Sequence, residues 1–179
     1  MRAMILAAGR GERLRPITDT LPKPLIEVHG KPLIVWHLER LASAGFREIV
    51  VNVSHLGSLI ETALGDGHRW GVRITWSREL VALETAGGIV NARLLLGPEP
   101  FLLVNADVYC DVSFASLRGL ALGSRLGHLV LVPNPEFRPE GDFSLSDGLV
   151  GNHGAPRYTY SGIGVLTPAI LNGVVPGTK

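Results

Sequence analysis

Short apolar runs that suit β-strands recur along the chain. Residues 3–8 form a buried-type run, residues 48–53 form the next, and residues 72–76 alternate between apolar and polar side chains. A strand that is apolar throughout is typical of a parallel sheet covered on both faces. Residues 101–104 and 128–132 have this character, so both are predicted to be central parallel strands.

Helical spacing appears between these runs. Ile34, Leu38 and Leu41 follow one another at i, i+4 and i+7, which places them on one face of a helix. Similar patterns predict helices over residues 56–64 and 85–96, and a glycine directly follows each of these two segments. Strand and helix patterns therefore alternate. This alternation predicts an α/β fold with a doubly wound, mostly parallel sheet.

Doubly wound sheets bind their ligands outside the carboxyl ends of the strands. The loops at residues 9–15, 105–107 and 52–55 follow predicted strands, so we expect the functional site there. After residue 133 the pattern changes to a loop rich in proline and glycine, and residues 157–166 form a further strand. Between them, Asp147-Gly148 predicts a small β-hairpin insertion formed by residues 143–145 and 149–150.

The composition narrows the class of protein. With 179 residues, 46% of them hydrophobic, the chain is expected to form a single domain over residues 1–179. The formal net charge of +1 gives no reason to expect nucleic acid or an acidic membrane surface as a partner. Cys110 is the only cysteine, so no disulfide framework and no cysteine-based zinc site is expected.

Targeting signals are not evident in the sequence. The first apolar run is short and is followed at once by arginines, which does not fit a signal peptide. No run approaches the ~20 apolar residues that a helix needs to span a bilayer. We therefore expect a cytoplasmic protein without a membrane partner, and the sequence leaves the oligomeric state open between a monomer and a weak dimer.

A loop rich in small and basic residues follows the first predicted strand. Gly9 and Gly11 are followed by Arg13, Arg15 and Lys23, the last of which stands between two prolines. Small residues expose backbone N–H groups, and neighbouring cations can neutralise several negative oxygens, which suits a polyphosphate. A Gly-x-Gly taken alone is equally compatible with a plain turn that ends a strand.

Two common phosphate-binding motifs are excluded. Leu14 stands where the dinucleotide-binding fingerprint has its third glycine, and Pro16 would stop a helix soon after. The Walker sequence Gly-x-x-x-x-Gly-Lys-Ser/Thr occurs nowhere in the chain.

The loop matches the pattern Gly-x-Gly-x-Arg-x-x-Pro-x-Thr…Pro-Lys-Pro. The matching positions are Gly9, Gly11, Arg13, Pro16, Thr18, Pro22, Lys23 and Pro24. In this signature the chain resembles the sugar-phosphate nucleotidylyltransferases. The resemblance implies a Rossmann-like nucleotidyltransferase fold, a nucleoside triphosphate in the loop, and phosphate contacts from Arg13 and Lys23.

Asp107 follows the predicted strand at residues 101–104 directly. A carboxylate there is well placed to hold a magnesium ion against phosphate oxygens, but a turn aspartate that caps the next segment has the same appearance. The resemblance favours the metal ligand, because the family places its metal aspartate after the equivalent strand. Ala106 is a mild departure from the usual Asn-Gly-Asp.

A second family-like segment, LETAGG, begins at Leu83. Relatives have Leu-Gly-Thr-Ala/Gly-Gly at the start of a helix beside the base, with Glu84 here in place of the first glycine. The alternative is an ordinary helix start capped by Thr85. Taken together, the resemblance implies these nucleotide-binding residues: Ala7, Ala8, Gly9, Gly11, Arg13, Lys23, Glu84, Gly87 and Asn105.

The remaining candidates are weaker. Gly141, Asp142, Ser161 and Gly162 resemble residues that line the sugar side in the family, but they are equally compatible with ordinary turn and strand positions. His37 falls on the apolar stripe of its helix and is predicted to be a core residue.

Within the family, the chain is most similar to uridylyltransferases that act on N-acetylmuramate 1-phosphate in cell-wall recycling. The strings that carry this are AAGRGERLRP, KPLIVWHLERL, LETAGG, FLLVNADV, GDF and YSGIGVL. The resemblance implies UTP and a sugar 1-phosphate as substrates, Mg²⁺ as cofactor, and Arg13, Lys23 and Asp107 as catalytic residues, with Asp107 as metal ligand. Relatives that use GTP or dTTP with mannose or glucose phosphates share the signature.

Family members continue past the equivalent of Lys179 into a helical end with a Trp-x-Asp-Val-Gly-type segment, whose aspartate is a second metal ligand. No such segment occurs in these 179 residues. We therefore expect a fragment, a truncated product, or a short form with impaired catalysis. A nucleotide-binding module without turnover is the alternative function.

Overall fold

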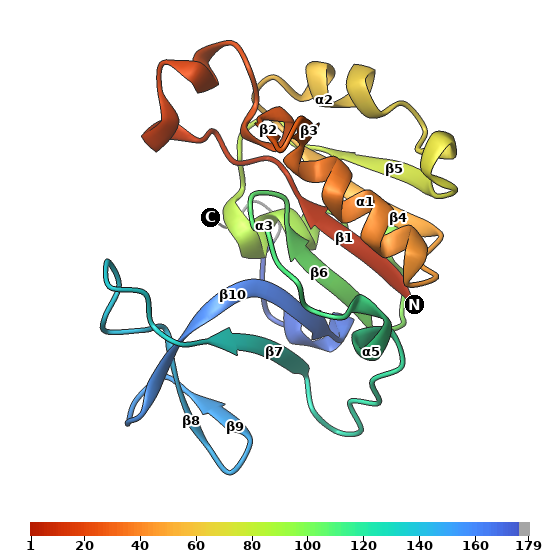
Figure 1. The fold of residues 1–179 in the computed structure, drawn as a ribbon. Coiled ribbons are helices and arrows are strands. Elements are labelled where there is room, and N and C mark those ends of the chain that lie inside the picture. The colour runs from red at the N-terminus through yellow and green to blue at the C-terminus, as the bar shows by residue number, and fades with distance from the viewer. Residues whose placement is uncertain (176–179) are drawn as a thin grey trace.

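The structure is a computed structural model that describes residues 1–175, and it is built on one eight-stranded sheet. Strands β5 (Arg73–Arg78), β4 (Glu48–Val53), β1 (Arg2–Leu6) and β6 (Phe101–Asn105) lie in this order and pair in parallel. β10 (Arg157–Leu166) then pairs antiparallel with β6 (Figure 1). The predicted doubly wound, mostly parallel α/β sheet is confirmed.

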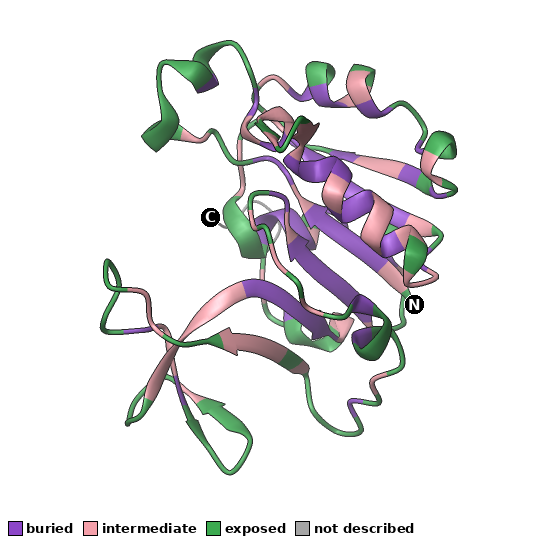
Figure 2. Cartoon of the chain, in the orientation of Figure 1, coloured by how far each residue is buried: buried purple, intermediate pink, exposed green. Residues whose placement is uncertain are grey.

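Helices cover both faces of the parallel strands. On one face, α1 (Leu33–Ser43), α2 (Gly57–Leu64) and α5 (Phe114–Arg118) contribute to a buried cluster with alternate residues of the sheet such as Ile5 and Val104. On the other face, α3 (Glu84–Asn91) and α4 (Arg93–Leu96) pack on the intervening residues. Figure 2 shows that the buried residues gather in β1, β6 and α1.

The predicted hairpin is confirmed. β8 (Phe143–Ser146) and β9 (Leu149–Gly151) pair antiparallel and project from the body of the protein in Figure 1. Asp147 and Gly148 both have positive φ angles, 51° and 73°. A two-residue turn of this kind requires left-handed backbone at both positions, which explains the sequence signal. A separate short ribbon pairs β2 (Glu27–Val28) with β3 (Lys31–Pro32).

The prediction for residues 128–132 is wrong. β7 (Gly127–Val132) is not a central parallel strand: it pairs antiparallel with β10, and none of its residues is buried. Val130 packs against one core cluster and Leu129 against the other, so both faces of the strand carry apolar side chains. A nearly continuous apolar run therefore arises here without a central position.

The other elements agree with the sequence except at their ends. The helix predicted over residues 85–96 is interrupted at Ala92, which separates α3 from α4. Five short 3₁₀ helices complete the described chain: Glu12–Leu14, Ile17–Asp19, Lys23–Leu25, His68–Trp70 and Pro168–Leu171. In residues 1–175 no helix is long and apolar enough to cross a membrane.

Candidate functional site

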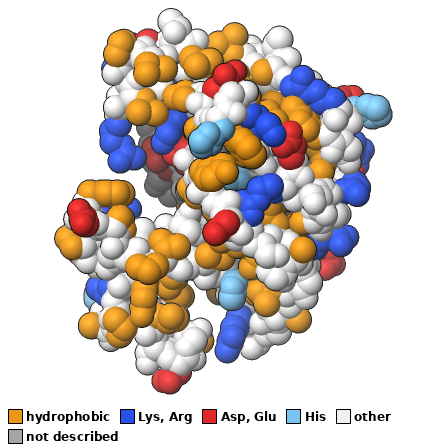
Figure 3. All heavy atoms as spheres, viewed as in Figure 1, with side chains coloured by type: hydrophobic (Ala, Val, Ile, Leu, Met, Phe, Trp, Pro, Cys, Tyr) orange, Lys and Arg blue, Asp and Glu red, His pale blue; other side chains and the backbone are white. Residues whose placement is uncertain are grey.

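A cavity of about 790 Å³ lies at the carboxyl ends of the central strands. Its walls come from the loop after β1, the end of β4, the segment before and at the start of α3, and the end of β6. It brings together most of the predicted nucleotide-binding residues and the predicted metal ligand Asp107. The nucleotide-binding residues in its lining are Ala7, Ala8, Gly9, Gly11, Arg13, Lys23, Glu84 and Asn105. In Figure 3 the visible face is hollowed between the body and the lobe that carries the hairpin, and Lys and Arg side chains border the upper side of the hollow.

The loop after β1 owes its shape to Gly11 and Thr18. Gly11 has a φ of 69°, a left-handed conformation that favours glycine. A Cβ atom on Gly11 would lie 2.9 Å from Thr18 Cγ2, and the Thr18 hydroxyl donates a 2.9 Å hydrogen bond to the Gly11 carbonyl. Thr18 is only 2% exposed. The glycine and threonine of the signature therefore fold the loop back on itself and present its backbone to the cavity.

Lys23 and Asp107 form an ion pair in the cavity wall, with side chains that are 24% and 37% exposed. The pair joins the signature loop to the end of β6. The alternative reading of Asp107 as a helix cap is wrong, because Ser113 caps α5 by accepting a 3.4 Å hydrogen bond from the Ser116 amide. A carboxylate and an ammonium group thus face the same space.

Arg13 lines the cavity with an exposed side chain and makes no ion pair within residues 1–175. The surface acid Asp19 pairs instead with Arg15, at 3.3 Å. Among residues 1–175, Arg13 therefore forms no surface ion pair with Glu12 or Asp19, the two nearby acids. The guanidinium is available to an anion.

The segment at the start of α3 divides into a lining part and a packing part. Glu84 and Thr85 line the cavity, whereas Gly87 is buried within α3 and is not among the lining residues. Glu84 has a φ of 58°, so a side chain stands where the backbone favours glycine. The alternative that Thr85 caps the helix is wrong, since α3 begins at Glu84 with Leu83 in the N-cap position.

The predicted sugar-side residues lie outside the cavity lining. Gly162, with a φ of 79°, lies against Asn105: a Cβ atom there would be 2.6 Å from Asn105 Nδ2. Asp142 accepts a 2.8 Å hydrogen bond from the Tyr160 amide, and Ser161 donates one of 2.8 Å to the Val130 carbonyl. A Cβ atom on Gly141 would lie 2.7 Å from Asn134 Oδ1. Gly162 therefore lies against a residue of the cavity wall, Asn105.

Part of the cavity wall carries no recognisable sequence motif. Asn52, Val81 and Ala82 line the cavity but were not among the predicted site residues. The position of Asn52 at the end of a strand was the one available signal, since residues 52–55 were expected to face the ligand edge. Behind Asn52 lies the buried carboxylate of Glu79, 7% exposed, which no motif marked.

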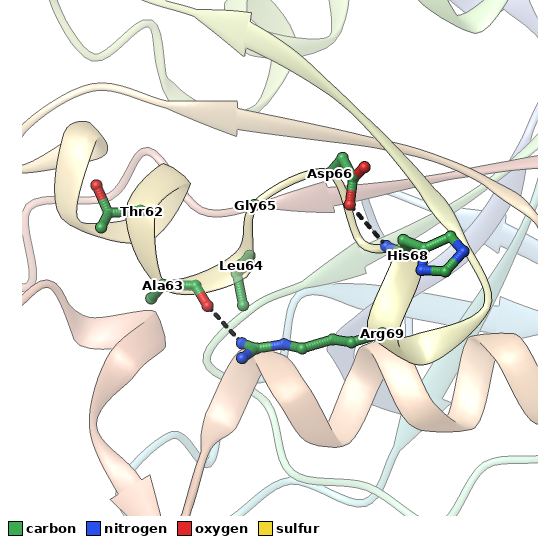
Figure 4. A pocket seen from close by; sticks show the side chains of 7 residues that line it. All are labelled: Thr62, Ala63, Leu64, Gly65, Asp66, His68 and Arg69. Carbon is green, nitrogen blue, oxygen red and sulfur yellow. Dashed lines mark hydrogen bonds between the residues drawn. The ribbon is translucent and has the colours of Figure 1, made fainter.

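Two further features lie outside the site. His37 is buried in the core as predicted, and burial lowers its pKa to about 4. A separate open hollow of about 430 Å³ lies at the C-terminal end of α2 (Figure 4). There Arg69 donates to the Ala63 carbonyl, and the His68 amide donates a 2.9 Å hydrogen bond to Asp66. These contacts are local and close the end of the helix.

Residues 2–125 match the family of nucleotidyl transferases. The N-acetylmuramate alpha-1-phosphate uridylyltransferase of Neisseria meningitidis is 52% identical over 99% of the chain and 80% of its own length. The chain belongs to the nucleotidyl transferase family. The family predicted from the loop signature is thereby confirmed, as is the expectation that the chain is a nucleotidyltransferase.

Two further matches have lower sequence identity. The mannose-1-phosphate guanyltransferase of Schizosaccharomyces pombe is 36% identical over 98% of the chain, which spans 52% of that enzyme's length. Among solved structures, HddC of Yersinia pseudotuberculosis complexed with GMP-PN has a TM-score of 0.82 at 21% identity. This match covers 99% of the chain and 81% of HddC, and it establishes the shared fold.

Proposed function

We propose that this nucleotidyltransferase transfers the uridylyl group of UTP to a sugar 1-phosphate, with N-acetylmuramate 1-phosphate as the preferred acceptor. The observation that carries the proposal is the cavity that gathers Arg13, Lys23 and Asp107 at the carboxyl ends of the strands. The choice of UTP and of the sugar is supported by the 52% identity to the Neisseria uridylyltransferase over nearly the whole chain.

The reaction needs no nucleophile from the protein. An oxygen of the sugar phosphate attacks the α-phosphorus of UTP in line, the bond to the β-phosphate oxygen breaks, and pyrophosphate leaves with both electrons of that bond. Two anions must meet, so positioning and charge neutralisation dominate the catalysis. In our proposal Arg13 and Lys23 contact the phosphates of the nucleotide, and the loop at Gly9 and Gly11 offers backbone N–H groups.

The donor set suits magnesium. Mg²⁺ is usually bound by one or two carboxylates, with substrate phosphates and water completing the shell. Asp107 supplies a carboxylate in the cavity, and residues 1–175 hold no cluster of three or more acidic, histidine or cysteine side chains that could bind a metal. We propose that Asp107 would hold Mg²⁺, which would supply positive charge to neutralise the phosphates. Lys23, which pairs with Asp107 in the structure, would contact a phosphate of the nucleotide.

The base and the sugar are proposed to lie at opposite ends of the cavity. Glu84 and Asn105 line it at the start of α3 and the end of β6. Gly162 of β10 packs against Asn105, a residue of the cavity wall, which supports a sugar side near Gly162 and Ser161. For Gly141 and Asp142 we propose an indirect role, because both hold the loop that packs beside β10.

The proposal is tested by pyrophosphate release from UTP, Mg²⁺ and N-acetylmuramate 1-phosphate. The assay is run on residues 1–179, here proposed as one nucleotidyltransferase domain, and on the longest product of the reading frame that encodes them. UTP should be preferred over dTTP and GTP. A preference for GTP with mannose 1-phosphate would assign the protein to the guanylyltransferases, and UTP binding without turnover would make it a nucleotide-binding module.

A further inference from the structure

A buried polar chain connects three strand ends beneath the cavity. The Ala7 amide donates to Asn52 Oδ1 at 2.7 Å, and Asn52 Nδ2 donates to Glu79 Oε1 at 2.7 Å. The other oxygen of Glu79 accepts a 2.9 Å hydrogen bond from the Leu83 amide. Ala7 follows β1, Asn52 belongs to β4, and Glu79 follows β5. The chain therefore joins the loop after β1 to the segment that leads into α3.

Both side chains are buried. Asn52 is 2% exposed and Glu79 is 7% exposed. A Cβ atom on Gly88 would lie 2.8 Å from Asn52 Nδ2 and 2.9 Å from Glu79 Oε1, so α3 packs directly on the pair. Gly88, the second glycine of the LETAGG segment, thus leaves room for this pair.

Stability alone does not account for a carboxylate in this place. Within residues 1–175 Glu79 has no ion-pair partner, and its oxygens accept from the neutral groups of Asn52 and Leu83. Buried ionic groups are often no more stabilising than well-packed apolar residues. A negative charge one hydrogen bond behind the wall of an anion site also works against the ligand. The role of the Glu79 carboxylate is therefore to fix the positions of the groups that it binds, Asn52 and the Leu83 amide.

The segment at residues 80–82 depends on this anchor. Among the described residues, the backbone at 80–82 makes no hydrogen bond, and Leu80 and Val81 are exposed. Val81 and Ala82 nevertheless line the cavity. The Leu83 amide bound to Glu79 is the point at which this segment is tied to the sheet.

We infer that Asn52 and Glu79 are positioning residues that fix the loop at Ala7 against the segment at residues 80–84, so that the cavity is preorganised for the nucleotide. This inference rests on the proposed function. Residues 7–11 are proposed to face the phosphates and residues 81–84 the nucleoside, so that a rigid link between them sets the spacing that a nucleotide must match. The acceptor sugar phosphate lies outside this link.

The directions of the hydrogen bonds allow a compensating pair of substitutions. Asn52→Asp places two carboxylates face to face. Glu79→Gln leaves an amide that cannot accept from both Asn52 and the Leu83 amide. In the double variant the new amide at position 79 donates to the new carboxylate at position 52. The amides of Ala7 and Leu83 keep their acceptors, and one negative charge remains.

The test compares the two single variants and the double variant with the parent in steady-state kinetics. Each single variant should raise KM for UTP about tenfold or more, because a buried polar group loses its partner, while KM for the sugar phosphate changes little. The double variant should have a lower KM for UTP than either single variant, although the negative charge, now at position 52 in the cavity wall, keeps it above that of the parent. Ser77→Ala is the matched control: it removes a part-buried 3.1 Å hydrogen bond from Asn91 Nδ2 that also joins β5 to α3, and it should leave KM for UTP unchanged.

Other outcomes overturn the inference. Single variants that lose thermal stability but keep the parental KM for UTP would reduce the pair to packing, and a double variant as impaired as the two singles combined would exclude the direct link. If a single variant fails to fold, the double variant decides: a double variant that folds supports the link, and a double variant that also fails to fold contradicts it.

Amide hydrogen exchange separates this inference from the proposed function. If the parent does not turn over UTP, the proposed function fails, but the amides of Ala7 and Leu83 should still exchange faster in each single variant and be protected again in the double variant. Unchanged protection in both single variants would overturn the link.

Discussion

Arg13→Ala is expected to separate catalysis from stability. The side chain lines the cavity, is exposed, and has no ion-pair partner within residues 1–175, so its loss should change the free energy of unfolding by no more than about 0.5 kcal/mol. A charge-assisted hydrogen bond to a phosphate contributes about 1.5–3 kcal/mol. Its removal should lower kcat/KM for UTP by roughly 10- to 150-fold.

Loss of charge stabilisation in the transition state should lower kcat as well as raise KM. The assay is pyrophosphate release at saturating sugar phosphate and varied UTP, together with urea unfolding of each variant. Arg15→Ala is the matched control, because Arg15 lies in the same loop, pairs with Asp19 at 3.3 Å on the surface, and is not a lining residue. Its loss should cost at most about 1 kcal/mol of stability and leave the kinetics unchanged.

The phosphate role of Arg13 would be refuted by a kcat/KM within about twofold of the parent. A loss of equal size in Arg15→Ala would also refute it, since that result would assign the effect to the net charge of the loop.

Three further predictions concern single residues. Asp107→Asn should abolish Mg²⁺-dependent turnover. It should lower the free energy of unfolding by at most about 1 kcal/mol, because the ion pair of Asp107 with Lys23 is partly exposed. Near-parental turnover would show that the metal is held elsewhere. Replacing Glu84 by glycine or by alanine should lower kcat/KM for UTP in both cases. The glycine variant should be the more stable of the two by about 1 kcal/mol, because the φ of 58° at this position strains any side chain. Equal free energies of unfolding in urea would contradict this. His37 should destabilise the fold in acid: burial lowers its folded pKa from 6.5 to about 4, so the unfolded state binds the extra proton, and about 3 kcal/mol present above pH 6.5 is lost as pH falls toward 4. His37→Leu should flatten the measured dependence of unfolding free energy on pH in that window, and an unchanged slope would assign it to other groups.

Some features of the fold could be predicted because their cause is local. The turn at Asp147-Gly148 was predictable since both residues adopt left-handed backbone readily, and the structure has both φ angles positive. The helix α1 was predictable because Leu38 and Leu41 repeat on the face that the core buries. The signature around Gly11 was recognisable as a pattern, but its reason, the contact with Thr18, needed coordinates.

The wrong prediction for β7 shows a limit of the hydrophobic pattern. An apolar run indicates that both faces of a strand are covered, but it does not indicate which strands lie beside it or in which direction they run. Leu129 and Val130 meet core residues on opposite faces, so the run looks the same as that of a central parallel strand. Pairing direction and position in the sheet depend on where β10 returns, which residues 127–132 do not encode by themselves.

At the site, the residue types near the strand ends follow from the order of the chain: glycines and cations come after β1, and a carboxylate comes after β6. The partners of these side chains follow from the packed fold, in which Lys23 pairs with Asp107, and Asp19 pairs with Arg15 and not with Arg13. In the packed fold Asn52 and Glu79, unremarkable in sequence, also bind each other beneath the cavity. The order of residues fixes the chemistry of each side chain. Hydrogen bonds and ion pairs form only when two side chains lie within a few ångströms of each other, and for distant segments that closeness arises only when the sheet is packed.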